Sequence, residues 1–206
     1  HHDRRGNQPH MLVTLATRTF TPEPTAAALR LGALARALAA GGDRVRVLTS
    51  RLAPSVARDA HESGENDERT EESHGLVNVR RAPVLRDRTG AVRGYVSYMS
   101  FDLPLLARLL TGPRPDVVVS EPPPTTGAAV RIACAARRVP YVYYCADIVS
   151  DAAALAGVPS IVVRTVAGLE SFALRGARRV IAVSDGVARR ARDLGARDVA
   201  VVPNGV

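Results

Sequence analysis

Lysine is missing from this 206-residue chain, so arginine supplies all 28 of its basic side chains. An arginine-only, alanine-rich composition is typical of a GC-rich genome, which accounts for part of the formal net charge of +8. The alternative is a surface for an acidic partner, such as phosphate, anionic lipid or nucleic acid. Because no run of five or six basic residues occurs, we do not expect nucleic acid to be a partner.

Cysteine is scarce as well. The two cysteines, Cys134 and Cys145, match neither a C-x-x-C motif nor the spacing of a zinc site. We therefore predict two buried, reduced thiols and no metal centre. Reduced thiols favour a cytoplasmic location.

Long apolar runs are also lacking. No stretch is long enough to span a bilayer, and the segment after Met11 is too short for a signal peptide. Residues 1–10 resemble a tag and linker remnant, so we take residues 11–206 as the domain. An apolar cluster between Tyr95 and Leu106 is expected to pack in the core. Alternatively, part of it contacts the inner face of a membrane or a lipid-linked acceptor.

What the chain does contain is a regular alternation of strand-like and helix-like segments. Strands are predicted at 11–17, 44–49, 76–81, 116–120, 141–145, 179–183 and 199–202. Helices are predicted at 26–40, 95–110, 126–137, 152–175 and 184–194, with Pro104 interrupting the second and Gly157 the fourth. The acidic segment 51–75 is predicted to be a solvated loop. This order indicates an α/β, Rossmann-like, doubly wound sheet of about seven mainly parallel strands with helices on both faces.

Ligands of such sheets bind beyond the carboxyl ends of the strands. This rule selects the loops 18–25, 121–126, 146–151, 184–185 and 203–205. The first loop contains no glycine, so it lacks the G-x-G-x-x-G motif of a dinucleotide site, and a Walker A motif needs the missing lysine. The helix that follows this loop still offers free N–H groups to an anion or a sugar hydroxyl.

Polar side chains in these loops are the candidate site residues. Asp147 follows a strand and is suited to accept a proton from a hydroxyl, or else it orders its own loop. Glu121 is a second candidate, unless it only caps the next helix. Glu23 and Thr25 belong to the first loop, where Thr25 is alternatively just an N-cap. Arg30 either faces phosphate or lies on a solvated helix face. All five histidines fall outside these loops, so we expect no histidine base.

Several segments occur in an order that resembles a known family. They are TPEPTA at 21–26, LGALARALAAGGDRVRVLT at 31–49, PDVVVSEPPP at 115–124, VPYV at 139–142, ARRVIAVS at 177–184 and VVPNGV at 201–206. Together they resemble the N-terminal domain of retaining GT-B glycosyltransferases of the family-four type.

The resemblance implies a domain that binds the acceptor of a sugar-transfer reaction. The acceptor would be a glycan, a lipid-linked sugar or a small molecule. A UDP- or GDP-linked sugar donor would be held mainly by a C-terminal domain absent from this chain, with Asn204 and Gly205 as the hinge. Asp147 would be catalytic, Glu23, Thr25 and Glu121 would contact the acceptor, and no metal would be needed. The chain alone, which stops in a turn, would be inactive.

The sequence departs from the family pattern at Thr25-Ala26, where many members have two glycines close to the donor phosphate. A Cβ atom at these positions restricts how closely a diphosphate can approach. One alternative from a different class also stays open. The chain would then be a self-contained α/β binding or regulatory domain without catalysis.

Overall fold

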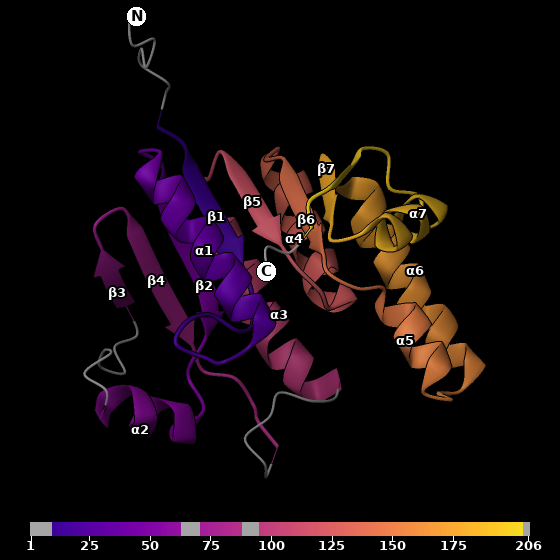
Figure 1. Cartoon of the computed structure of the whole chain (residues 1–206), viewed down its shortest axis with the longest axis horizontal. Coiled ribbons are helices and arrows are strands. Elements are labelled where there is room, and N and C mark those ends of the chain that lie inside the picture. Colours follow the sequence, from indigo (N-terminus) through magenta and orange to yellow (C-terminus); the bar gives the residue numbers. More distant parts are fainter. Residues whose placement is uncertain (1–9, 63–70, 88–94, 204–206) are drawn as a thin grey trace, which may run out of the picture.

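The computed structural model describes residues 10–62, 71–87 and 95–203 (Figure 1). Two predictions fall outside this part of the chain. They are the hinge at Asn204 and Gly205 and most of the linker remnant at 1–10.

One eight-stranded sheet with the order β3-β4-β2-β1-β5-β6-β7-β8 forms the centre of the molecule. Seven strands run parallel: β1 (Leu12–Ala16), β2 (Arg44–Ser50), β4 (Val77–Ala82), β5 (Val117–Ser120), β6 (Tyr141–Cys145), β7 (Arg179–Ala182) and β8 (Val199–Val201). The predicted α/β, mainly parallel architecture is confirmed, and each of the seven predicted strands is present within one or two residues. Parallel pairing brings the carboxyl ends of all seven strands to the same edge.

The acidic segment 51–75 is not the loop that we predicted. It contains helix α2 (Pro54–Glu62) and strand β3 (Glu71–His74). Helix α2 begins at a proline, which the first turn tolerates, and it buries Ala57. Strand β3 pairs antiparallel with β4 across a turn in which Gly75 has a φ of +61°. A short, charged antiparallel strand at a sheet edge shows no hydrophobic alternation, so its sequence pattern does not predict it.

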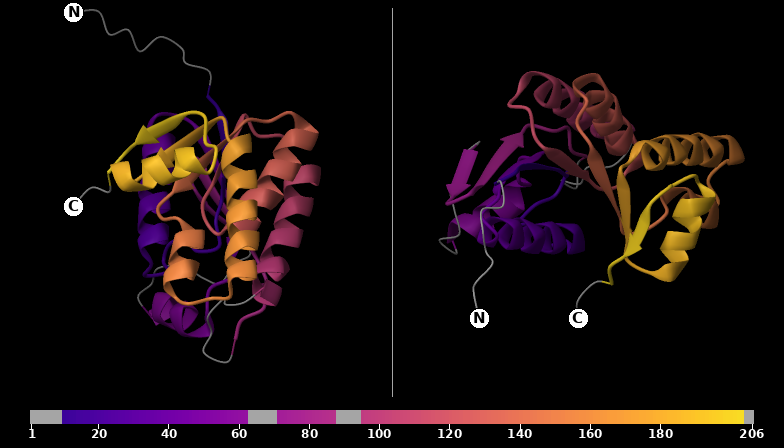
Figure 2. Two further views of the ribbon diagram at one scale, coloured as in Figure 1. Left: turned by 90° about the vertical axis from the view of Figure 1, so that its right-hand side faces the viewer. Right: turned by 90° about the horizontal axis from the view of Figure 1, so that it is seen from above.

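Helices cover both faces of the sheet (Figure 2). Helix α1 (Ala26–Ala40) packs Leu31 and Ala35 against the buried valines of β1, β2 and β4. On the other face, α3 (Tyr95–Thr111), α4 (Pro124–Arg137) and α6 (Ser160–Gly176) enclose a second core around β5 and β6. Helix α7 (Asp185–Asp193) packs against β7 and β8. Thr25 and Ser184 cap α1 and α7 with their side chains, as the sequence indicates.

Pro104 does not divide the helix that contains it, since α3 is one helix. The break predicted at Gly157 is present. A turn at Gly157 (φ +71°) separates α5 (Val149–Leu155) from α6. The apolar cluster of α3 is largely core, since Phe101 and Leu105 are buried, although Leu103 is 57% exposed. Within the described residues no helix has the length and hydropathy needed to cross a membrane.

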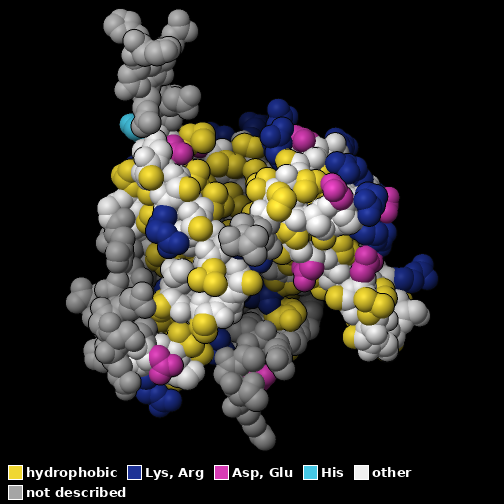
Figure 3. Space-filling view, in the orientation of Figure 1, with side chains coloured by type: hydrophobic (Ala, Val, Ile, Leu, Met, Phe, Trp, Pro, Cys, Tyr) yellow, Lys and Arg dark blue, Asp and Glu magenta, His cyan; other side chains and the backbone are white. Residues whose placement is uncertain are grey.

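The two cysteines are free and buried, and burial raises the pKa of each thiol to about 12. The prediction of buried reduced thiols is therefore confirmed. On the face seen in Figure 3, arginine side chains gather around α7 with acidic side chains among them. This face therefore carries no block of purely basic charge.

Candidate functional site

A pocket of about 500 Å³ opens at the carboxyl edge of the sheet, where the loops after β1, β5 and β6 meet the start of α1. All five residues that the sequence selected line it: Glu23, Thr25, Arg30, Glu121 and Asp147. They come from parts of the chain far apart in sequence, and parallel pairing of β1, β5 and β6 brings them together. The pocket also contains Arg18 and Arg86, which the sequence analysis did not select.

Glu121 lies at the end of β5 and is 6% exposed. Its carboxyl group accepts a hydrogen bond from the hydroxyl of Thr17, the first residue after β1. The helix after Glu121 has Pro123 as its N-cap and no side-chain capping bond, so the alternative that Glu121 caps this helix is wrong. The side chain instead joins the loops after β1 and β5.

The surroundings of Glu121 favour its neutral form. Burial raises the pKa of Glu121 from 4.5 to about 7, and the negative charge of Asp147 acts in the same direction. The hydrogen bond from Thr17 and the positive charges of Arg30 and Arg18 oppose this rise in pKa. A carboxyl group with this pKa exchanges its proton near neutral pH, as a general acid or base must.

Thr25 has two roles that the sequence analysis had treated as alternatives. Its hydroxyl accepts a hydrogen bond of 3.1 Å from the N–H of Ala28 and so caps α1. The same hydroxyl lies 3.2 Å from that of Thr19, and both threonines line the pocket. Capping therefore does not remove Thr25 from the site.

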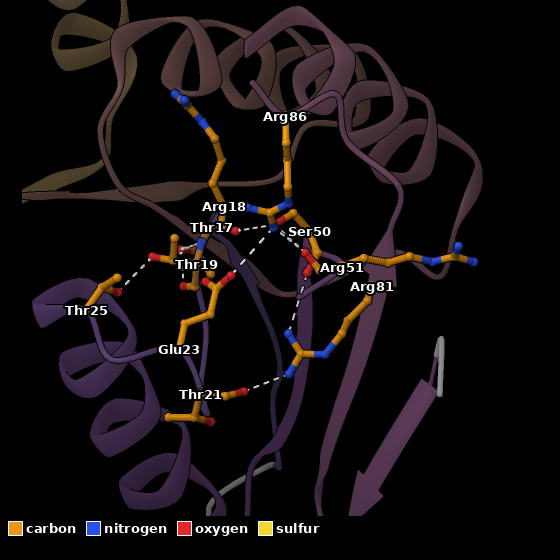
Figure 4. A network of polar contacts seen from close by, with 10 residues as sticks. All are labelled: Thr17, Arg18, Thr19, Thr21, Glu23, Thr25, Ser50, Arg51, Arg81 and Arg86. Atoms are coloured by element: carbon orange, nitrogen blue, oxygen red, sulfur yellow. Dashed lines mark hydrogen bonds and ion pairs between the residues drawn. The ribbon is translucent and has the colours of Figure 1, made fainter. Parts of the chain in front are cut away.

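Glu23 is bound into a polar network at one end of the pocket (Figure 4). Its Oε1 lies 3.6 Å from Nη2 of Arg86. The same Nη2 lies 3.3 Å from the hydroxyl of Ser50 and donates to the carbonyl oxygen of Arg51. Glu23 is 6% exposed, its second carboxylate oxygen has no hydrogen-bond partner, and burial raises the pKa of its carboxyl group. An unpartnered buried acceptor beside a pocket is suited to a hydroxyl or amine of a ligand.

Arg18 belongs to a second polar cluster, on the side of the pocket that faces α3. Figure 4 shows its side chain directed away from the Glu23 network. The guanidinium lies over the ring of Tyr98, 3.9 Å from the centroid, and is attracted to the carboxylate of Asp102. Asp102 is 2% exposed and accepts a bond of 2.6 Å from the hydroxyl of Thr126. No hydrophobic period marks these residues, which explains why the sequence analysis missed Arg18.

Asp147 is exposed, and its carboxylate makes no hydrogen bond to any described residue. The alternative that it orders its own loop is therefore wrong. Glu170 of α6 has this role instead, since its carboxylate accepts bonds of 2.8 and 3.2 Å from the N–H groups of Val149 and Ser150. It also accepts a bond of 2.6 Å from the Ser150 hydroxyl. Glu170 thus holds the segment that follows Asp147, while the Asp147 carboxylate stays open to the pocket.

Histidine, cysteine, aspartate and glutamate side chains do not gather in threes to form a possible metal site in the part of the chain that is described. The pocket is lined by carboxyl, guanidinium and hydroxyl groups together with apolar residues such as Val56 and Pro123.

A family model described as a glycosyl transferase 4-like domain matches residues 25–205. The chain belongs to this family. The match begins at Thr25, the residue that caps α1, so it leaves out four pocket residues of the loop after β1, namely Arg18, Thr19, Glu23 and Pro24. The family resemblance and the GT-B type of fold expected from the sequence are confirmed.

Solved structures share the fold of this glycosyl transferase 4-like domain at low sequence identity. Sucrose-phosphate synthase from Thermosynechococcus elongatus is 15% identical, with a TM-score of 0.66 over 96% of this chain and 49% of that one. Anabaena HepE, solved in complex with UDP, is 19% identical, with a TM-score of 0.57 over 95% of this chain and 44% of that one. A putative UDP-N-acetylglucosamine 2-epimerase from Listeria monocytogenes is 11% identical, with a TM-score of 0.54 over 92% and 44%.

These similarities show the fold alone, because a synthase and a putative epimerase both share it. The assignment to glycosyltransferases comes from the family match. The chain spans about half the length of the synthase and somewhat less than half of the other two structures. No curated protein matches the chain in sequence.

Proposed function

We propose that this glycosyl transferase 4-like domain is the N-terminal, acceptor-binding half of a retaining, hexosyl-transferring enzyme that uses a nucleotide-sugar donor. The observation that carries the proposal is the meeting of Glu23, Thr25, Glu121 and Asp147 in one pocket at the carboxyl edge of the sheet. The pocket lining includes carboxyl and hydroxyl oxygens as well as arginine side chains. A sugar hydroxyl both donates and accepts hydrogen bonds, so it fits such a surface.

Asp147 is our candidate for the residue that acts on the acceptor hydroxyl. Its carboxylate is exposed at the pocket and free of protein hydrogen bonds, so it can accept the hydroxyl proton. The acceptor oxygen then forms a bond to the anomeric carbon of the donor sugar, on the same face from which the nucleoside diphosphate departs, so that the configuration is retained. The bond from that carbon to the nucleoside diphosphate breaks, and its electron pair leaves with the diphosphate.

Glu121, Glu23 and Thr25 are proposed to hold the acceptor. Glu121 lines the pocket with Asp147, whose charge acts on it, and Glu23 has a carboxylate oxygen without a partner among the described residues. Thr25 presents a hydroxyl at the start of α1. These groups bind and orient the acceptor so that the attacking hydroxyl points to Asp147.

The donor, a UDP- or GDP-linked sugar, is proposed to bind mainly to a second Rossmann-like domain, with Asn204 and Gly205 at the hinge. This fits a chain that spans about half of its structural relatives. The acceptor is a glycan, a lipid-linked sugar or a small molecule. A lipid-linked acceptor would bring the domain to the inner face of the membrane, in the cytoplasm.

The test is a transfer assay with the complete gene product, using a panel of UDP- and GDP-sugars and detecting glycosylated acceptor. Asp147→Asn should lower turnover at least about 100-fold, as loss of a general base does. Asp151→Asn is the matched control, because Asp151 lies in the same segment but pairs with Arg190 at 2.7 Å outside the pocket. The 206-residue chain by itself should transfer no sugar.

Each result has a distinct meaning. Unchanged turnover of the Asp147 variant would remove this residue from the mechanism. A product with the inverted anomeric configuration would overturn the proposed retention. Absence of transfer with every donor, despite acceptor binding, would favour the self-contained binding or regulatory domain.

A further inference from the structure

Three arginines line the pocket, and they differ in how many partners they have. Arg86 contacts Glu23, Ser50 and the Arg51 carbonyl oxygen, so its guanidinium is engaged by the protein. Arg18 is held by the ring and hydroxyl of Tyr98 and by the charge of Asp102, but two of its nitrogen atoms have no partner among the described residues. Arg30 lies near the ring of Tyr144, 5.7 Å from its centroid.

Arg18 is the more constrained of these two arginines. Its Nε and Nη2 atoms are buried without hydrogen-bond partners, and burial lowers the pKa of the side chain. A buried guanidinium whose N–H groups lack acceptors has lost hydration without replacement, which is unfavourable. An anion bound at Arg18 would supply the hydrogen-bond acceptors that the guanidinium has lost with its hydration. The ring of Tyr98 and the charge of Asp102 hold the guanidinium beside the pocket in advance of binding.

We propose that the acceptor carries an anionic group, a phosphate or a carboxylate, which binds to Arg18 with Arg30 as the second cation. This proposal rests on the proposed function and adds the chemical class of the substrate. Asp102 is then a positioning residue, because it acts through Arg18 and does not line the pocket.

The carboxyl groups of the pocket are compatible with an anionic ligand. Glu23 is paired with Arg86 at 3.6 Å, and Glu121 is flanked by the charges of both Arg18 and Arg30. The pKa of Glu121 is about 7, so near neutral pH much of it is uncharged and can donate to an anionic oxygen. Only Asp147 stays exposed and free of an arginine partner, and it would face the attacking hydroxyl and not the anion.

The experiment compares charged and neutral probes on the same chain. The chain is titrated separately with glucose 6-phosphate, glucuronate, glucose and UDP. Binding of each probe is followed by the NMR chemical shifts of the protein. The variants are Arg18→Gln, Arg30→Gln and Asp102→Asn. Arg164→Gln is the control, because Arg164 is an exposed arginine of α6 outside the pocket. Thermal unfolding checks that each variant is folded. If Arg18→Gln unfolds the chain, Arg30→Gln still tests the anion site, because Arg30 lies on the surface of α1.

We expect Arg18→Gln to weaken binding of glucose 6-phosphate or glucuronate about 10-fold or more and to leave glucose binding unchanged. Asp102→Asn should weaken binding of the charged sugars by a smaller factor, and it too should leave glucose binding unchanged. Equal binding of charged and neutral sugars to the unmodified chain, or equal losses in the Arg164 control, would overturn the proposal.

The two possible sources of the anion give different results. If Arg18→Gln weakens UDP and leaves glucose 6-phosphate unaffected, the anion belongs to the donor, and an anionic acceptor is wrong. The proposed function fails separately, in the transfer assay. Charge-selective binding without transfer by the complete protein would retain the anion site and reject the glycosyltransferase mechanism.

Discussion

The hydroxyl of Thr17 is hydrogen-bonded to the carboxyl group of Glu121, although 104 residues separate them in the chain. Thr17 Oγ1 also lies 2.8 Å from the carbonyl oxygen of Thr19. The hydroxyl of Thr17 has one proton, which it can donate to Glu121 or to the Thr19 carbonyl oxygen, and the ionised form of Glu121 is the stronger acceptor. The pair therefore links the protonation of the site to the loop after β1.

The first prediction concerns the pH dependence of stability. The pKa of Glu121 is about 7 in the folded chain and 4.5 as its reference value, so the folded state binds a proton that the unfolded state has released. The stabilisation is complete below pH 4.5 and is lost as the pH rises through 7. It amounts to about 3 kcal/mol at most, because the pKa values of the folded and the unfolded chain differ by about 2.5. Glu121→Gln should remove this part of the slope in urea unfolding between pH 5 and pH 8.

Thr17→Val provides the companion measurement for the same pair. It removes the hydrogen bond that stabilises the ionised form, so the pKa of Glu121 should rise further and the fall in stability should move to higher pH. An identical pH profile in both variants and the unmodified chain would show that Glu121 is ionised throughout.

The second prediction concerns Glu170, which holds the loop of Asp147. Glu170→Ala leaves the N–H groups of Val149 and Ser150 without their acceptor, so the free energy of unfolding should fall by about 2–4 kcal/mol. Ser150→Ala removes only the hydroxyl contact and should cost about 1 kcal/mol. NMR amide shifts should change around Asp147 in the first variant. If they stay unchanged, Glu170 does not position this loop.

Local patterns along the chain were sufficient to predict most of the fold. Helix α1 was predicted with its observed bounds because its apolar period, the Thr25 cap and the glycines after Ala40 agree with one another. The parallel order of the strands then predicted which loops meet at one edge. That the five selected residues line a single pocket follows from this topology and not from any one motif.

The rest could not be predicted, because it depends on side chains that reach across the fold. Glu170 looks like any helical glutamate in sequence, and its partners are 20 and 21 residues away in the chain. Arg86 enters the pocket from a segment with no periodic pattern. Helix α2 is amphipathic but short and mainly polar, and strand β3 has four residues of which two are glutamates, so the charge of this segment favoured a loop.

The third prediction tests the packing of α4 on the sheet. A Cβ atom on Gly127 would lie 2.6 Å from the ring of Tyr143 and 2.7 Å from Cβ of Ala173. Both neighbours are fully buried, so Gly127→Ala should destabilise the chain by about 1–3 kcal/mol through overpacking. Gly168 in α6 has nothing within 4 Å of such a Cβ, so Gly168→Ala should stabilise by about 0.5–1 kcal/mol. Chemical denaturation measures both. The same sign for both variants would contradict the close contact at Gly127.

The fourth prediction concerns Arg46, a cation of β2 that is 7% exposed and lies far from the pocket. Burial and the charges of Arg80, Arg108 and Arg137 lower its pKa to about 10. Its Nε lies 3.2 Å from the hydroxyl of Thr14, whereas Nη2 is buried without a partner.

A buried charge with like charges around it contributes little to stability, and an apolar side chain of similar volume often replaces it without loss. Arg46→Met should therefore leave the free energy of unfolding within about 1 kcal/mol of the unmodified chain or raise it. Arg46→Ala is the control, because it removes the charge but leaves a cavity and should cost about 2 kcal/mol or more. Urea unfolding at two salt concentrations is measured for both variants and for the unmodified chain. Salt should change the stability of the unmodified chain more, because only that chain has the repulsion between Arg46 and the neighbouring arginines. An equal, large loss in both variants would mean that the guanidinium itself stabilises the sheet.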